Sequence, residues 1–250
     1  MASPVIAADA WVHEVRAGTG PRFVFFPPAG SSASSGWTLN PAVPAGWSLA
    51  SIQYPARGPR LREPAAGSVR ELSEACLPAL AGGGPTLLFG HSFGAYVAYD
   101  AAQLLEQQAE PAVGLIVSGM PAPGSVLRDM TGGDFTDGAL VTTLGRQGVT
   151  APELLTNEEL MEMVLPALRA DLALARAYRD GHGRRLARTP VLALAGRDDR
   201  LVTLDQLTAW RTVTDRWLGH HLPPGEHFYY RQDPAGLAST VERYWPRGST

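Results

Sequence analysis

The feature that most constrains the fold of this chain is a short apolar run that leads through the pentapeptide GHSFG, residues 90–94, into small residues. Gly-x-Ser-x-Gly between a strand and a helix is typical of a nucleophile elbow, a strained turn that lifts a serine hydroxyl clear of the sheet. Glycines are needed there because a β-carbon would strike a neighbouring strand or helix. The sequence therefore predicts Ser92 as a catalytic nucleophile.

The residues around the pentapeptide favour an elbow over an ordinary turn, which a chain with 27 glycines could also contain by chance. Residues 86–89 have the pattern of a buried strand. The small apolar residues that follow recur at helical spacing: Ala95, Ala98, Ala102 and Leu105. Strand, turn and helix are the setting that an elbow requires.

Apolar runs and helical patterns alternate along most of the chain. Strands are expected at residues 22–26, 49–53, 87–89, 113–118, 191–195 and 217–222. Helices are expected at residues 68–81, 92–108, 204–213 and 233–245. Such alternation is typical of a parallel sheet with helices on its faces. We predict an α/β-hydrolase fold, with a mostly parallel central sheet flanked by helices, as a single domain over residues 1–250.

The alternation stops at about residue 120 and resumes at about residue 188. This stretch holds a glycine pair at 132–133 and a helical pattern over 158–178 with an apolar stripe. We predict a lid inserted at about residues 120–188, in which Pro166 kinks or splits the helix. The alternative is that the stripe only packs against the core.

The base that activates Ser92 should be a histidine oriented by a carboxylate. In α/β-hydrolases the acid and then the histidine follow the serine along the chain. Of six histidines, His227 alone lies in a turn-rich loop between the last expected strand and the last expected helix. From such a loop an imidazole would reach back to the elbow, so His227 is the predicted general base.

The acid is expected at the end of a strand between these two residues. Asp198 and Asp199 follow the strand at 191–195 and Gly196, whereas no carboxylate immediately follows the strand at 113–118. One of the two aspartates would cap the next helix or be solvated. We predict Asp199, because the hydrolase turn usually places the acid three residues after the glycine, and Asp198 is the alternative.

An oxyanion hole needs two backbone N–H groups, one from the residue after the nucleophile and one from a loop after an early strand. Phe93 fills the first position. The loop after residues 22–26 begins with Pro27 and Pro28, which have no N–H, so Ala29 is the first residue able to donate. Ala29 and Phe93 are the predicted pair, and a plain turn is the alternative for this loop.

Together these pieces resemble the type II thioesterases, the free-standing editing hydrolases of nonribosomal peptide and polyketide synthases. The matching segments are FPPAG (26–30), QYPARG (53–58), GHSFG (90–94), LPALRAD (165–171) and GEHF (225–228). The resemblance spans nearly the whole chain, and the second and fourth segments are far more specific than the elbow. The chain departs from the family at GMPAP (119–123) and at Ala56, near the lid base, which bears on acyl specificity.

The resemblance implies a serine hydrolase with Ser92, His227 and Asp199 as its triad. Its substrate would be an acyl group on the phosphopantetheine arm of an acyl or peptidyl carrier protein, released through an acyl-enzyme. A general carboxylesterase or lipase would use the same triad and is the alternative. A non-catalytic binding protein of this fold would normally lack one triad member. No cofactor is implied.

The resemblance also suggests how the substrate is held. Arg57, Arg60 and Arg62 follow the carboxyl end of a strand, where the mouth of the site is expected. Carrier domains in these systems tend to be acidic, so we expect these arginines to dock the carrier. Met163 and Leu168 of the lid would line the acyl channel and set chain-length preference.

Composition argues against several other classes. The formal net charge is −3 and the basic residues are scattered, so we expect no nucleic-acid partner. Cys76 is the only cysteine, which excludes an internal disulfide and a cysteine-based metal site, and we expect no metal. No run approaches the roughly 18 apolar residues of a membrane span. We expect a cytoplasmic protein without a membrane partner.

Overall fold

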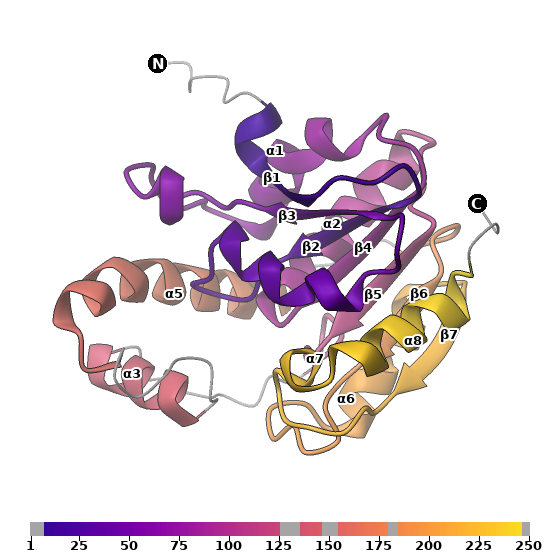
Figure 1. Ribbon diagram of the computed structural model, residues 1–250. Helices are drawn as coiled ribbons and strands as arrows, with labels where there is room; N and C mark the ends of the chain where they lie inside the picture. Colours follow the sequence, from indigo (N-terminus) through magenta and orange to yellow (C-terminus); the bar gives the residue numbers. More distant parts are fainter. Residues whose placement is uncertain (1–7, 126–135, 147–154, 180–184, 247–250) are drawn as a thin grey trace.

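A seven-stranded sheet forms the centre of the computed structural model, which describes residues 8–125, 136–146, 155–179 and 185–246 (Figure 1). Its strands are β1 Val12–Arg16, β2 Arg22–Phe26, β3 Ser48–Ile52, β4 Thr86–His91, β5 Gly114–Ser118, β6 Val191–Leu194 and β7 Trp217–His221. They lie in the order β1-β3-β2-β4-β5-β6-β7. Only β1 runs antiparallel to its neighbour. The predicted mostly parallel sheet is confirmed.

The strand β1 is the one described strand that the sequence analysis missed. It pairs with β3 alone and lies at the edge of the sheet. His13 and Glu14 are exposed, and Val15 is its only buried residue. An edge strand that faces solvent lacks the continuous apolar run by which the central strands were recognised.

Helices cover both faces of the sheet (Figure 1). Outside the lid they are η1 Ala8–Trp11, η2 Ala33–Ala42, η3 Gly58–Arg60, α1 Val69–Leu80, α2 Phe93–Gln107, α6 Leu204–Thr208, η4 Ala209–Val213, α7 Tyr229–Gln232 and α8 Pro234–Tyr244. Side chains alternate along β2, so that Val24 and Phe26 pack with α1 and α2. Phe23 and Phe25 pack on the other face with η2 and α8. The two faces thus form two apolar cores.

Capping residues explain where two of these helices begin. The Ser68 hydroxyl accepts a hydrogen bond of 3.0 Å from the N–H of Glu71 at the start of α1. At α8, Asp233 accepts from the N–H of Gly236 at 2.9 Å, and Pro234 occupies the first helical position. Both starts lie within one residue of the predicted helix.

The lid lies between β5 and β6 and includes α3 Asp137–Arg146 and α5 Glu158–Arg179, set to one side of the sheet (Figure 1). The glycine pair at 132–133 lies outside the described residues. The helix α5 runs through Pro166 without a break, so of the two predicted outcomes the split is wrong and the kink stays a prediction. Pro166 is exposed, and the carbonyl that it leaves without a helical partner is free to bind water.

Candidate active site

The turn between β4 and α2 has the conformation of a nucleophile elbow. Ser92 has φ 52° and ψ −127°, which few residues other than glycine adopt. Its N–H donates to the carbonyl of Ser118 at 2.7 Å, which ties the turn to the end of β5. Its hydroxyl makes no capping hydrogen bond to α2. The strained turn therefore leaves the Ser92 oxygen available for other chemistry.

Both glycines of the pentapeptide are required by close backbone contacts. A β-carbon on Gly90 would overlap the backbone of Gly94 and Ala95 in the first turn of α2. A β-carbon on Gly94 would overlap the carbonyl groups of Phe26 and Pro27. The elbow therefore packs directly against the loop after β2, which carries the predicted oxyanion residue Ala29.

The structure brings Asp199 and His227 together. Asp199 Oδ2 lies 2.9 Å from His227 Nδ1, and the Asp199 side chain is fully buried. The second carboxylate oxygen, Oδ1, accepts from the N–H of Leu201 at 2.8 Å, which fixes the carboxylate plane. Asp198 is exposed. Of the two neighbouring aspartates, Asp199 alone can orient the imidazole.

The loops that carry these two residues are joined by their backbones. The N–H of Asp198 donates to the carbonyl of Gly225 at 2.9 Å, and the N–H of Arg197 donates to the carbonyl of Pro223 at 2.8 Å. A β-carbon on Gly196 would overlap the carbonyl of Glu226, so glycine is required for this approach. The spacing between the acid and the histidine is thus set by the main chain.

His227 also lies against the elbow. Its ring centroid is 4.7 Å from that of His91, the residue before Ser92. A β-carbon on Gly119, at the end of β5, would lie 2.9 Å from Cε1 of both imidazoles. Asp199, His227 and the elbow that carries Ser92 therefore meet at the carboxyl ends of β4, β5 and β6.

His91 belongs to the pentapeptide GHSFG, but the sequence analysis made no separate prediction for its side chain. It is fully buried, and its Nδ1 lies 3.0 Å from Ser118 Oγ, which in turn lies 2.8 Å from the Tyr229 hydroxyl. Burial above all, and then the charges of His227 and Arg231, holds the pKa of His91 well below its ordinary value of 6.5. An uncharged ring therefore packs against His227. A histidine at the end of an apolar strand was the available signal.

The two predicted oxyanion residues, Ala29 and Phe93, come from the two segments that meet where Gly94 packs against Phe26 and Pro27. Phe93 is the first residue of α2, and N–H groups in a first helical turn have no carbonyl of their own helix to bind. In the loop after β2, Ser31 N donates to Pro28 O at 3.1 Å and Gly30 N donates to Asp171 Oδ2 at 2.8 Å. Among the described residues the N–H of Ala29 has no acceptor. Both amides are free to bind a substrate oxygen.

The docking role expected of Arg57 and Arg60 is wrong, because both side chains are buried. Arg57 forms a bidentate ion pair with Asp171, and its Nη2 lies 2.9 Å from Oδ1. Arg60 donates to the carbonyl of Gln53 at 2.9 Å and lies over the Trp11 ring. Of the three arginines expected to dock the carrier, Arg62 is the one whose side chain is exposed. Asp171 and Trp11 are distant in the sequence from this loop, which is why the pattern of the loop alone suggested a free basic surface.

The two lid residues expected in the acyl channel differ in position. Leu168 is buried in an apolar cluster with Leu140, Met161 and Leu165, against which Ala29 packs. Met163 is 48% exposed and is not part of that cluster. The expected place of both residues in the acyl channel stays a prediction.

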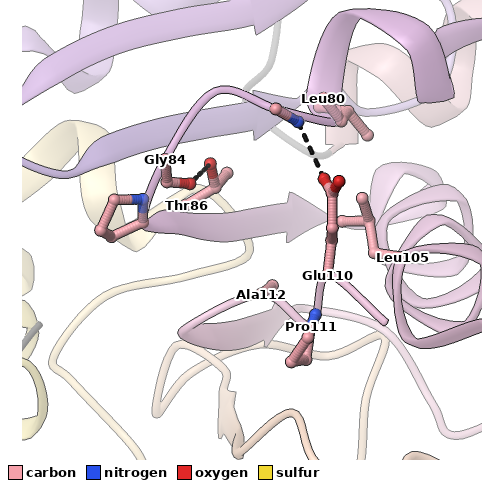
Figure 2. Close-up of a pocket in the computed structure, with 9 residues that line it drawn as sticks. Leu80, Gly84, Thr86, Leu105, Glu110, Pro111 and Ala112 are labelled. Carbon is pink, nitrogen blue, oxygen red and sulfur yellow. Dashed lines mark hydrogen bonds between the residues drawn. The ribbon is translucent and has the colours of Figure 1, made fainter. Parts of the chain in front are cut away.

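A pocket of about 320 Å³ lies at the start of β4, and Figure 2 shows residues that line it. It is lined by the start of β4 at Thr86, the end of α2 at Leu105 and the segment from Glu110 to Ala112. Glu110 Oε2 accepts from the N–H of Gly82 at 2.8 Å across its rim. Since Ser92 follows the opposite end of β4, this pocket is not part of the candidate active site.

Among the described residues, no cluster of three or more histidine, cysteine, aspartate or glutamate side chains is suited to hold a metal ion. No helix in that part of the chain is long and apolar enough to cross a bilayer.

Comparison with known proteins adds a family and a fold. The family model that describes the thioesterase domain matches residues 21–244 of this chain. Thioesterase PikA5 of Streptomyces venezuelae is 36% identical over 213 residues, which cover 83% of this chain and 75% of that protein.

Solved structures are similar over almost the full length of the chain. YbtT, a type II thioesterase from the yersiniabactin NRPS/PKS biosynthetic pathway, superposes with a TM-score of 0.86 at 28% identity, covering 96% of this chain and 100% of YbtT. BorB, the type II thioesterase from the borrelidin biosynthetic cluster, superposes with a TM-score of 0.82 at 32% identity, covering 96% and 99%.

Proposed function

The chain belongs to the thioesterase family, as a type II thioesterase of the α/β-hydrolase fold, and on that premise we propose Ser92, His227 and Asp199 as its catalytic triad. One observation carries the proposal. The 2.9 Å contact from Asp199 Oδ2 to His227 Nδ1 lies next to the elbow that carries Ser92, since the His227 ring packs against that of His91. The family are serine hydrolases acting on thioesters, and this arrangement supplies the parts that such a reaction needs.

The proposed reaction is two acyl transfers. With Nδ1–H donated to Asp199, the imidazole of His227 presents Nε2 as the base that takes the Ser92 proton. Ser92 Oγ attacks the thioester carbonyl, and the oxygen that becomes negative is held by the N–H groups of Ala29 and Phe93. The C–S bond breaks, and the sulfur leaves as a thiolate, which is a good leaving group because a thiol has a pKa near 8.5. The proton that His227 took from Ser92 passes to this sulfur, so the imidazole is neutral again before water enters.

In the second transfer His227 takes a proton from water, and the resulting hydroxide attacks the acyl-Ser92 ester. The acid is released, and the Ser92 oxygen recovers a proton from His227. An alkoxide is a far poorer leaving group than a thiolate. The oxyanion hole therefore matters most in this deacylation step.

We further propose that the acyl group is carried on the phosphopantetheine arm of an acyl or peptidyl carrier protein. The similarity to BorB and to YbtT, which comes from an NRPS/PKS pathway, supports this substrate class. Such carriers also imply action in the cytoplasm, with which the free, buried thiol of Cys76 agrees. A general carboxylesterase activity is the alternative, and substrate preference distinguishes the two.

The test compares wild type with Ser92→Ala on an acyl carrier thioester, an acyl-CoA and a nitrophenyl ester. Thiol release is followed with a thiol reagent, to which Cys76 adds no signal because burial raises its pKa to about 12. We expect the carrier thioester to be preferred and Ser92→Ala to lose the activity. The exposed Ser239→Ala is the matched control and should behave as wild type.

Two results would contradict the proposal. Preference for the nitrophenyl ester over both thioesters would favour a general esterase. Full activity of a folded Ser92→Ala would remove Ser92 as the nucleophile.

A further inference from the structure

The carboxylate of Asp171, in the lid, contacts the loops after β2 and β3 at the carboxyl ends of the strands, which we call the sheet end. Asp171 lies in α5 and is 1% exposed. Its Oδ2 accepts from the N–H of Gly30, after β2, at 2.8 Å. Both of its oxygens bind the guanidinium of Arg57, after β3, with Nη2 2.9 Å from Oδ1. The lid is therefore bonded to the backbone of the oxyanion loop itself.

That loop has few other restraints near Ala29. Gly30 has φ +72°, a left-handed conformation in which a side chain would be strained. A turn is closed by Ser31 N and Pro28 O at 3.1 Å. The peptide group between Ala29 and Gly30 lies within this turn. Its N–H belongs to Gly30 and donates to Asp171. The direction of the neighbouring Ala29 N–H therefore depends on where Asp171 lies.

The same face of α5 makes a second contact with the loop. Leu168 lies three residues before Asp171, on the same side of the helix. Its Cβ is 3.1 Å from the position that a β-carbon on Gly30 would occupy. Ala29 packs against the apolar cluster to which Leu168 belongs. Movement of α5 would therefore disturb this turn through both contacts.

Arg57 is held firmly from its other side. Its Nε donates to the carbonyl of Pro55 at 2.9 Å, and its own carbonyl accepts from Gln53 Nε2 at 2.9 Å. Gln53 Oε1 accepts from the N–H of Ala33 at 3.0 Å, which joins the loops after β2 and β3. Because a bidentate guanidinium fixes the plane of its partner, Arg57 orients the Asp171 oxygen toward Gly30.

We propose that Asp171 is a positioning residue for the oxyanion hole, so that Ala29 N–H is correctly aimed only when the lid helix is docked. The inference rests on the proposed function, in which Ala29 is an oxyanion donor. Asp171 does not touch the substrate and acts through the turn at residues 28–31. Lid position and transition-state stabilisation are thereby coupled.

The first test is Asp171→Asn, which keeps the volume and removes the charge. We expect kcat to fall by about tenfold to a hundredfold with KM within about twofold, since the lost interaction concerns the transition state. Butylboronic acid takes up Ser92 Oγ as the fourth ligand of boron and places a hydroxyl in the oxyanion hole. Its affinity should fall by a factor similar to that of kcat.

A second variant separates positioning from stability. Arg57→Met with Asp171→Leu removes both charges, so that neither is left buried without its partner. We expect the midpoint of thermal unfolding to recover relative to Asp171→Asn while kcat stays low, because leucine offers Gly30 N–H no acceptor at all. Recovery of kcat together with stability would overturn the proposal. If the double variant does not fold, the boronic acid affinity of Asp171→Asn decides.

Asp100→Asn is the matched control. Asp100 is also a buried carboxylate, accepts from the Tyr178 hydroxyl of α5 at 3.2 Å and pairs with Arg70 at 3.1 Å. It binds the lid without touching the oxyanion loop. We expect a lower unfolding temperature with kcat within about threefold of wild type.

Equal kcat losses in Asp100→Asn and Asp171→Asn would overturn the proposal, as would unchanged kcat or boronic acid affinity in Asp171→Asn. Failure of the proposed function would look different. Ser92→Ala would then stay active, whereas failure of this inference alone leaves Ser92→Ala inactive and Asp171→Asn like wild type.

Discussion

The sheet end and the lid are held in place by different kinds of interaction. At the sheet end, backbone contacts at Gly94 and Gly196 bring the loops together, and Asp199 binds His227 only 28 residues away. The lid is joined to the sheet end by side chains. Arg57 reaches Asp171 across 114 residues, and Gly30 reaches it across 141.

This difference teaches where the molecule is sensitive to substitution. Main-chain contacts survive most side-chain changes, so the sheet end should keep its shape when its polar side chains are altered. The lid depends on a few side chains that cannot be replaced without loss of its contacts. Substitutions of Ser92, Asp199 or His227 should therefore change activity far more than stability, and substitutions of the lid contacts should change stability as well.

The largest expected effect is at the sheet end. Asp199→Asn would leave His227 in the wrong tautomer, and we expect kcat/KM for a thioester to fall by up to about ten-thousandfold with little change in unfolding temperature. Asp198→Asn, at an exposed neighbour, is the control and should cost little. A larger loss for Asp198→Asn would move the acid role to that residue.

The next effect concerns the stability of the lid contact. Arg57→Met leaves the Asp171 carboxylate buried without its partner, and we expect the free energy of unfolding to fall by about 3–5 kcal/mol. Arg62→Met, at an exposed arginine of the same loop, should change it by less than about 0.5 kcal/mol. Urea unfolding measures both. Equal stability of the two variants would mean that the buried pair contributes nothing.

A smaller loss is expected inside the apolar cluster of the lid. Leu168→Ala should destabilise the protein by about 2–4 kcal/mol, because it leaves a cavity beneath α5. Met163→Ala should change stability by less than about 0.5 kcal/mol, since Met163 is largely exposed. Urea unfolding of the two variants is the measurement. If Met163→Ala proved the more destabilising, the outer face of α5 would be a packed surface.

The smallest effect is a pH dependence that belongs to the sheet end. Burial holds the pKa of His91 well below 6.5, so below about pH 6.5 the unfolded chain binds a proton that the folded chain does not. His91 therefore makes the free energy of unfolding fall as pH drops, by at most about 1.4 kcal/mol per pH unit. His91→Gln should lose that contribution.

Urea unfolding at several pH values between 5 and 7 would measure this slope. His13→Gln is the control, because His13 is exposed and should leave the slope as in wild type. An unchanged slope in His91→Gln would mean that His91 is protonated in the folded protein.

The sequence predicted the sheet far better than the lid, for physical reasons. Phe23 and Phe25 face one core while Val24 and Phe26 face the other, and strands buried on both faces give continuous apolar runs that are easy to recognise. The sparse edge strand β1 was missed. In the lid, the partner of Asp171 lies 114 residues away, and no local pattern could identify it.

The candidate site shows the same contrast. Ser92, Asp199 and His227 belong to short motifs whose glycines and turns are local, so their positions could be predicted. The burial of Arg57 and Arg60 could not be predicted, since it depends on Asp171 and Trp11, which lie far along the chain. His91 was overlooked because only the packed structure puts its ring against His227.

The most direct test of the account is to find where the acyl group goes. The protein is quenched with acid during turnover of an acyl carrier thioester, and its peptides are analysed by mass spectrometry. We expect an added acyl mass on the peptide that contains Ser92, with no acyl mass and no acid release in Ser92→Ala. An acyl mass on another residue, or release of the acid by Ser92→Ala at the wild-type rate, would contradict it.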